Sequence, residues 1–474
     1  MHHALLKPLL ESLLKHSLKP STKNSLKPPA KTWLRPLFAG SALLSFSLAV
    51  WPLDLLQAYE AAKLQDANIL ATRAATLASQ ERLPQARAQM LPNVGVNINY
   101  TRNRLTSTSP SFLGEDQTTE TGYPSSNLAL AVRQPLYRPV LAAQYRQAQA
   151  QVDDANALLA QEEQTLVVRV ASAYFEAVLS NEQLALVLAQ QAFNRTQLDA
   201  ARKIFAAGAG IRTDVDEAQA RLDMSLALEI EARQNIGYTQ QQLQVLVNQA
   251  VDVLDPLDVT KLELLAPQPA RLEDWIARAE QGSPQLRSLK AQMEAAREEV
   301  AKARTGHLPT LDAVAQWSRS KSDSVTSIRS AYDNKSLGLQ LNIPIYAGGA
   351  VNSAVRQALA NQERSEQALE GVRRELGVRV NKEFRGVTES IPKIRALEQA
   401  VTSADQLVLS SRRSFQAGSR TVIDVLNAEQ QRMVVLRDLA QARYVYLISK
   451  IRLLALAGDA DLEAVQAVNR MLKH

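Results

Sequence analysis

The chain has 474 residues and a formal net charge of +6, but the first 49 residues hold seven Lys or Arg against one acid, Glu11. The rest balances 47 basic residues (54 − 7) against 47 acidic ones (48 − 1), and so lacks the positive surface that nucleic-acid backbones require. The absence of cysteine excludes disulfides and thiolate chemistry. Five scattered histidines and the lack of nucleotide-binding or hydrolase motifs give no reason to expect an enzyme, a metal or a cofactor.

Residues 1–49 have the features of a secretory signal peptide. A basic segment broken by prolines precedes an apolar stretch at 37–49, which ends in the small residues Ser47 and Ala49. A membrane-anchoring helix is the alternative, but this stretch is too short to cross about 30 Å of hydrocarbon. Since no later apolar run reaches the length of a transmembrane helix, we expect any membrane contact to be made by strands.

The remaining chain contains an internal repeat, with halves at 50–249 and 271–458, a linker at 250–270 and a tail at 459–474. The segment VRQPLY that ends at Tyr137 resembles LNIPIY that ends at Tyr346. A second motif shared by the two halves begins with Ala-Gly and ends with Asp-Val. Its two aspartates, Asp214 and Asp424, lie 424 − 214 = 210 residues apart, a whole number of heptads.

The helices expected in chain order lie at 53–90, 139–205, 215–248, 272–304, 350–416 and 422–456. Apolar residues recur every seven positions in the two long ones, with Gln191 as the polar break: Val170, Ala177, Leu184, Gln191, Leu198, Phe205, and Val380, Val387, Ile394, Val401, Val408, Phe415. This spacing predicts antiparallel coiled-coil packing. A helix of about 67 residues is roughly 100 Å long and needs lateral partners along its length. Three glycines and Pro392 interrupt the second long helix, where we expect a bend.

Strand pairs are expected at 93–135 and 310–344, where short segments alternate apolar and polar residues. Long polar loops at 102–127 and 318–335 would join the strands of each pair, and Pro135 and Pro344 would end the second strand of each. Four aromatic residues near strand ends suggest girdles at a membrane interface: Tyr100, Tyr137, Trp317 and Tyr346.

An ordinary hairpin on a soluble sheet is the alternative for each pair. In a membrane, however, four strands would leave unpaired amides at both edges, so strands of other subunits must close the sheet. A dimer would give eight strands with a bore filled by side chains, whereas a trimer would give twelve with room for water. The polar inner face favours the trimer.

With this duplicated strand–proline–long-helix plan and its two turn motifs, the chain after the leader resembles the TolC family of outer-membrane efflux and secretion channels. The resemblance implies a mainly α, mixed fold: a twelve-stranded trimeric barrel in the outer membrane of a Gram-negative bacterium above a tunnel of long helices. It also implies a passive exit duct that works with a periplasmic adaptor and an inner-membrane ABC or proton-driven pump.

The resemblance further assigns roles to residues of the two turn motifs. Thr213, Asp214 and Arg420 correspond to residues that tie neighbouring helices at the closed tip, and Asp424 to a constriction aspartate. Phe415 and Asn427 depart from the family pattern, because a tyrosine and a second constriction aspartate are expected there. The turns at Gly208 and Gly418 would contact the adaptor.

Two questions stay open at the level of the sequence. Asp214 and Asp424 also suit helix N-termini, where the dipole favours acids. The cargo, either small molecules or unfolded secreted proteins, is not readable. The competing hypothesis for the whole chain is a structural periplasmic coiled-coil protein, which would have no use for four alternating strands.

Overall fold

The computed structural model describes residues 52–110, 114–322 and 330–473, and the expected signal peptide lies outside them. In these ranges the chain is mainly α-helical with a four-stranded antiparallel sheet, as predicted. The elements are α2 (Leu55–Gln65), α3 (Ala67–Gln80), α4 (Arg82–Ala88), β1 (Asn93–Pro110), β2 (Asp116–Tyr137), α5 (Pro139–Ala206), α6 (Arg212–Val247), α7 (Leu272–Gly282), α8 (Pro284–Arg304), the 3-10 helix η1 (Thr305–His307), β3 (Thr310–Lys321), β4 (Ala331–Asn342), α9 (Ala350–Gln416), α10 (Val422–Ala457) and α11 (Leu462–Asn469). None of the helices described is both long and apolar enough to cross a membrane.

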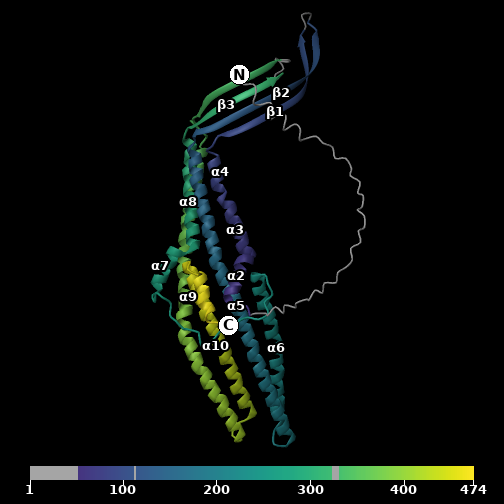
Figure 1. Ribbon diagram of the computed structural model, residues 1–474, viewed down its shortest axis with the longest axis vertical. Helices are drawn as coiled ribbons and strands as arrows, with labels where there is room; N and C mark the ends of the chain where they lie inside the picture. Colours follow the sequence, from purple (N-terminus) through teal and green to yellow (C-terminus); the bar gives the residue numbers. More distant parts are fainter. Residues whose placement is uncertain (1–51, 111–113, 323–329, 474) are drawn as a thin grey trace, which may run out of the picture. The chain divides into compact units, whose positions relative to one another are not determined.

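The long helices form two antiparallel hairpins, α5 with α6 and α9 with α10 (Figure 1). Most of the heptad positions face the packed interior, and Val380, Val387 and Ile394 are at most 1 % exposed, but the last position on α5, Phe205, is 45 % exposed. Gln191, the polar break, is satisfied because its Nε2 donates to Glu229 Oε2 of α6 at 2.6 Å. The predicted coiled-coil register is therefore confirmed.

Helix α9 is continuous through Gly371, Gly377, Gly386 and Pro392, so these residues do not interrupt it as expected. A Cβ at Gly386 would lie 2.5 Å from Ser449 Oγ of α10, and glycine here lets the two helices approach closely. Packing against α10 along this stretch outweighs the weak helix propensity of the four residues.

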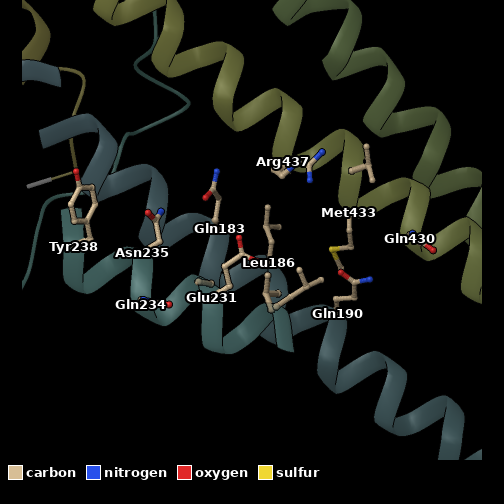
Figure 2. A pocket seen from close by; sticks show the side chains of 14 residues that line it. Gln183, Leu186, Gln190, Glu231, Gln234, Asn235, Tyr238, Gln430, Met433 and Arg437 are labelled. Atoms are coloured by element: carbon tan, nitrogen blue, oxygen red, sulfur yellow. The ribbon is translucent and has the colours of Figure 1, made fainter. Parts of the chain in front are cut away.

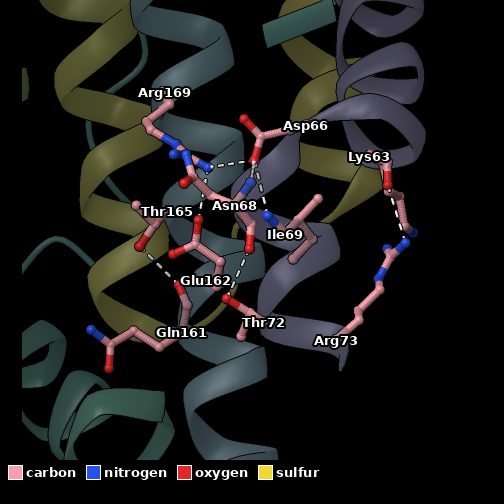
Figure 3. A network of polar contacts seen from close by, with 10 residues as sticks. All are labelled: Lys63, Asp66, Asn68, Ile69, Thr72, Arg73, Gln161, Glu162, Thr165 and Arg169. Carbon is pink, nitrogen blue, oxygen red and sulfur yellow. Dashed lines mark hydrogen bonds and ion pairs between the residues drawn. The ribbon is translucent and has the colours of Figure 1, made fainter. Parts of the chain in front are cut away.

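The helix predicted at 53–90 is divided into α2, α3 and α4. At the first break the buried Asp66 caps α3, because its Oδ1 accepts hydrogen bonds from the backbone N–H groups of Asn68 and Ile69 at 3.0 Å. The same oxygen accepts from Arg169 Nη2 of α5 at 3.1 Å, so the break is fixed to the long helix (Figure 3).

The helix predicted at 272–304 is likewise divided, into α7 and α8. Pro284 is the first residue of α8 and cannot donate a backbone hydrogen bond to the preceding turn. A side chain at Gly282 would collide with the carbonyl of Ala457, so the end of α7 is held against the end of α10.

The sheet has the strand order β1-β2-β3-β4, and its register brings the apolar residues of all strands onto one face. One row across the sheet is Val94, Val132, Ala315 and Leu337. The adjacent row, on the other face, is Gly95, Ala131, Gln316 and Ser336. On the apolar face Val94 is 62 % and Leu337 85 % exposed, so the single chain leaves this face uncovered.

The loop predicted at 102–127 is mostly strand. Strands β1 and β2 continue beyond the four-stranded part as a two-stranded ribbon, whose last pair is Pro110 with Asp116. Most of its side chains are polar, with Leu105 and the buried Tyr123 as exceptions, and the hydroxyls of Thr108 and Thr118 lie 3.1 Å apart. So few apolar residues form no alternating pattern, and the sequence therefore did not reveal these strands.

The second predicted loop, 318–335, is shortened because β3 runs to Lys321 and β4 starts at Ala331; residues 323–329 lie outside the described part. Strand β2 runs through Pro135 to Tyr137 with a register shift, so this proline marks an irregularity and does not end the strand as predicted. Strand β4 ends at Asn342, two residues before Pro344.

The main hydrophobic core lies halfway along α5. The Phe175 ring contacts those of Tyr174 and Tyr444, each with centroids 5.7 Å apart. The region predicted as a linker, 250–270, adds the buried Leu254 and Leu257 to this core. The core thus joins both helical hairpins.

Candidate functional site at the helical turns

The turns that join α5 to α6 and α9 to α10 have the same backbone geometry. Gly208 and Gly418 have φ values of +75° and +76°, which other residues rarely adopt. Their N–H groups donate to the carbonyls of Phe205 and Phe415 at 2.9 Å. The turn by itself therefore requires glycine at both positions.

The two turns differ in how they cap the following helix. Thr421 and Asp424 form a capping box, in which Asp424 Oδ2 accepts from the Thr421 N–H and hydroxyl at 2.9 Å. These bonds hold the pKa of Asp424 below its ordinary value. Ile211 replaces the threonine in the first turn, where no side chain caps α6. Among the described residues, Asp214 and Thr213 make no side-chain hydrogen bond or ion pair.

Arg420 is exposed next to the second turn and is bonded to its own hairpin. Its Nη1 donates to the hydroxyl of the fully buried Ser411 in α9 at 3.0 Å. Within the described part of one chain it forms no ion pair within 4 Å, although its charge helps to lower the pKa of Asp424.

Phe415 borders a small apolar cluster that unites both hairpins near the turns. The buried members are Leu198 of α5, Ala218 and Leu222 of α6, and Val422 and Leu426 of α10, with Phe193, Val215 and Phe415 against them. Where the family resemblance implied a tyrosine hydroxyl, this chain uses apolar contact.

Asn427 is bonded to Arg221, a residue that the sequence analysis missed. Its Oδ1 accepts from Arg221 Nη2 at 2.7 Å, and Gln430 Oε1 accepts from Nη1 at 2.9 Å. Glu217, one turn earlier on α6, pairs with the same guanidinium at 2.8 Å. The spacing of Glu217 and Arg221 is visible in the sequence, but their contact with α10 depends on how the hairpins pack.

A second polar contact between the hairpins was also missed. The Arg412 guanidinium of α9 lies 5.1 Å from the ring centroid of Phe193 on α5. It also lies 3.7 Å from Glu429 of α10, a buried carboxylate that pairs with Arg432 at 3.4 Å. The region near the turns is therefore held by both apolar and charged contacts.

A groove of about 790 Å³ lies between α5, α6 and α10 (Figure 2). Its lining mixes amides and charges with apolar side chains, including Gln183, Gln190, Glu231, Arg437, Leu186 and Met433. Across the described ranges there is no group of three or more His, Cys, Asp or Glu that could hold a metal ion.

The base of the sheet is fastened to the start of α5 by a buried carboxylate. Asp312 of β3 is 2.6 Å from both Arg133 of β2 and Arg138, the residue before α5. The sequence showed Asp312 only as one polar residue of an alternating strand.

The four predicted interface aromatics lie at different levels along the strands. Tyr137 is opposite Leu311, and Trp317 lies six residues farther along β3, which corresponds to about 20 Å. Tyr100 is well inside β1, opposite Ser126, and Tyr346 follows β4 and is 88 % exposed.

Comparison with known proteins identifies the family. The model of the outer membrane efflux protein family matches residues 58–249 and 275–459. The chain is 33 % identical over 432 residues to the alkaline protease secretion protein AprF of Pseudomonas aeruginosa, covering 90 % of each. It is 30 % identical over 413 residues to the proteases secretion protein PrtF of Dickeya chrysanthemi, covering 86 % of this chain and 89 % of PrtF.

A solved structure shares the fold. The open state of the MtrE outer membrane channel of Neisseria gonorrhoeae superimposes with a TM-score of 0.71 at 16 % identity, over 86 % of this chain and 89 % of MtrE. These matches confirm the resemblance to the TolC family. The chain belongs to the outer membrane efflux protein family, and it is an outer-membrane exit duct of the kind used in efflux and type I secretion, not an enzyme.

Proposed function

We propose that this protein is a trimeric duct that exports unfolded proteins received from an inner-membrane ABC transporter through a periplasmic adaptor. The names of AprF and PrtF, which are protease secretion proteins, support protein as the cargo. In the mature protein residues 1–49 have been removed as a signal peptide.

The proposal of a trimer rests on the open edges of the four-stranded sheet. Strands β1 and β4 are its edges, and their amides would cost several kcal/mol each if left unpaired in lipid. The apolar face suits lipid and the opposite face, with Gln316 and Ser336, suits water. Three copies close twelve strands around an aqueous bore, whereas two copies would close eight around side chains.

The helical turns form the periplasmic end of the duct. Thr213 and Asp214 have no side-chain partner among the described residues, and they would accept Arg420 of a neighbouring copy when this end is closed. Asp424 of each copy contributes a carboxylate to the constriction, and the turns at Gly208 and Gly418 meet the adaptor. Weak, partly exposed contacts suit an end that must open.

Secretion by cells tests the cargo. A Gram-negative host without its own duct of this family would express this chain with the transporter and adaptor of a protease secretion system. We expect active protease in the medium, with a cytoplasmic enzyme retained in the cells as the control for lysis. Restored drug resistance without secreted protease would overturn the proposed cargo and favour small-molecule efflux.

A further inference from the structure

We infer that Arg221 controls how readily the periplasmic end of this duct opens, by joining the α5/α6 hairpin to the α9/α10 hairpin. The inference rests on the proposed function and assigns a residue outside the two turn motifs. The Arg221 cluster consists of Arg221 and Glu217 on α6 with Asn427 and Gln430 on α10.

The geometry of the cluster is that of a bridge between helices. Two nitrogens of one guanidinium donate to α10, to Asn427 at 2.7 Å and to Gln430 at 2.9 Å. The backbone carbonyl of Arg221 accepts from Asn194 Nδ2 of α5 at 3.2 Å, so its position on the first hairpin is fixed as well. Asn194 is buried, at 4 % exposure.

The chemistry of the cluster gives a bond of limited strength. The positive charge is balanced by Glu217 on the same helix, at 2.8 Å, so that α10 supplies only neutral acceptors. The Arg221 side chain is 22 % exposed, so water can replace those acceptors when the helices part. An arginine can reach both amides because its donors form a rigid fork, which a lysine lacks.

The cluster acts on opening because its bonds join the two hairpins of one chain. Both bonds break when α6 moves away from α10. They are preserved when the two hairpins of the chain move together as one unit. Interactions made in only one of two states shift the balance toward that state. In this proposal the bonds are made when the end is closed and broken when it opens, so the cluster favours the closed end; the open state solved for MtrE shows that a channel of this fold can open.

Single-channel recording of the purified full-length protein in planar bilayers tests the inference. We expect Arg221→Gln to raise the fraction of time in the high-conductance state roughly tenfold, as for loss of a hydrogen bond to a charged group. The matched control is Arg212→Gln, on the same helix, whose side chain is 80 % exposed and, among the described residues, pairs with Asp216 alone. It should behave as wild type.

A second variant tests the bond and not merely the presence of the arginine. Asn427→Asp places a carboxylate opposite Arg221 and should lower the open fraction, but should lose this effect when combined with Arg221→Gln. Unchanged thermal unfolding of the trimers would show that the variants still assemble.

The outcomes separate this inference from the proposed function. If the wild type forms channels and Arg221→Gln opens no more often than Arg212→Gln, the role of Arg221 is wrong. If the wild type inserts but conducts no ions in any variant, the duct itself is wrong.

Discussion

At the scale of single residues, the carboxylate of Asp424 is fixed by the residue that begins its helix. Thr421 donates to it from both backbone and hydroxyl, whereas Asp214, at the repeated position, follows Ile211 and has no such donor. The bonds from Thr421 orient the Asp424 carboxylate and lower its pKa. Both aspartates lie in the first turn of their helices, where the dipole favours acids, and their part in a gate stays a proposal.

The capping box gives a pH dependence that can be measured. Because the folded pKa of Asp424 lies below its ordinary 3.8, its stabilisation of α10 is complete above that value and is lost as the pH falls through the folded pKa. We expect Asp424→Asn to speed amide hydrogen exchange in the first turn of α10 at neutral pH. The difference from wild type should vanish in acid, where the wild type loses the same bonds.

Two variants check this assignment. Thr421→Ala should reproduce the faster exchange, because it removes the reciprocal cap bond. Asp438→Asn, on the same helix and far from its start, should leave the first turn unchanged. A pH-independent difference between Asp424→Asn and wild type would contradict the capping role.

At the scale of elements, α9 and α10 approach closely at a glycine that faces a serine. Gly386 is required by the Ser449 side chain, whereas a Cβ at Gly377 on the same helix would meet nothing within 4 Å. Two glycines that look alike in the sequence therefore have opposite structural meanings. Only the first is a packing requirement.

Alanine substitutions distinguish the two glycines. We expect Gly386→Ala to lower the free energy of unfolding by about 1–3 kcal/mol, because the added methyl group overpacks the contact with Ser449. Gly377→Ala should raise it by about 1 kcal/mol through helix propensity. Denaturant unfolding of the purified protein measures both, and Ser449→Ala should restore part of the loss in Gly386→Ala. Equal effects at the two glycines would show that the close contact is unimportant.

At the scale of the whole molecule, the sheet of a single chain has open edges, and one of its faces is more apolar than the other. Leu337, Leu339 and Leu341 of β4 are all more than half exposed, and no strand pairs with the outer edge of β4 within the described chain. The ion pairs of Asp312 with Arg133 and Arg138 fasten this sheet to the start of α5. Apolar area of this size is covered by lipid or by other copies.

Arginine substitutions on the two faces of β4 test this polarity. We expect Leu339→Arg to disfavour membrane insertion by up to about 2–4 kcal/mol, the cost of arginine on a lipid-facing strand. Ser336→Arg, on the opposite face of the same strand, should be tolerated. The measurement is the yield of heat-modifiable trimer in the outer-membrane fraction, and similar yields for both variants would be incompatible with the proposed barrel.

The positions of the turn residues could be predicted from the internal repeat, but the hydrogen bonds and ion pairs of the candidate site could not. The turn glycines and aspartates were located because a repeat of whole heptads places them at equivalent ends of two helices. Arg221, Arg412 and Asp312 were missed, since their partners lie about 180 residues or more away or on another hairpin. No local period specifies which side chain of one hairpin meets which side chain of the other.

By itself the sequence determined the periodic features: the long heptad helices, the alternating strands and the duplicated plan. These depend on the regular spacing of side chains along one element, which a pattern of residues records directly. The tertiary structure decided the two-stranded ribbon of β1 and β2, the breaks at Asp66 and Pro284, and the charged contacts between hairpins. Those features arise from which surfaces meet in space, and such contacts leave no period in the chain.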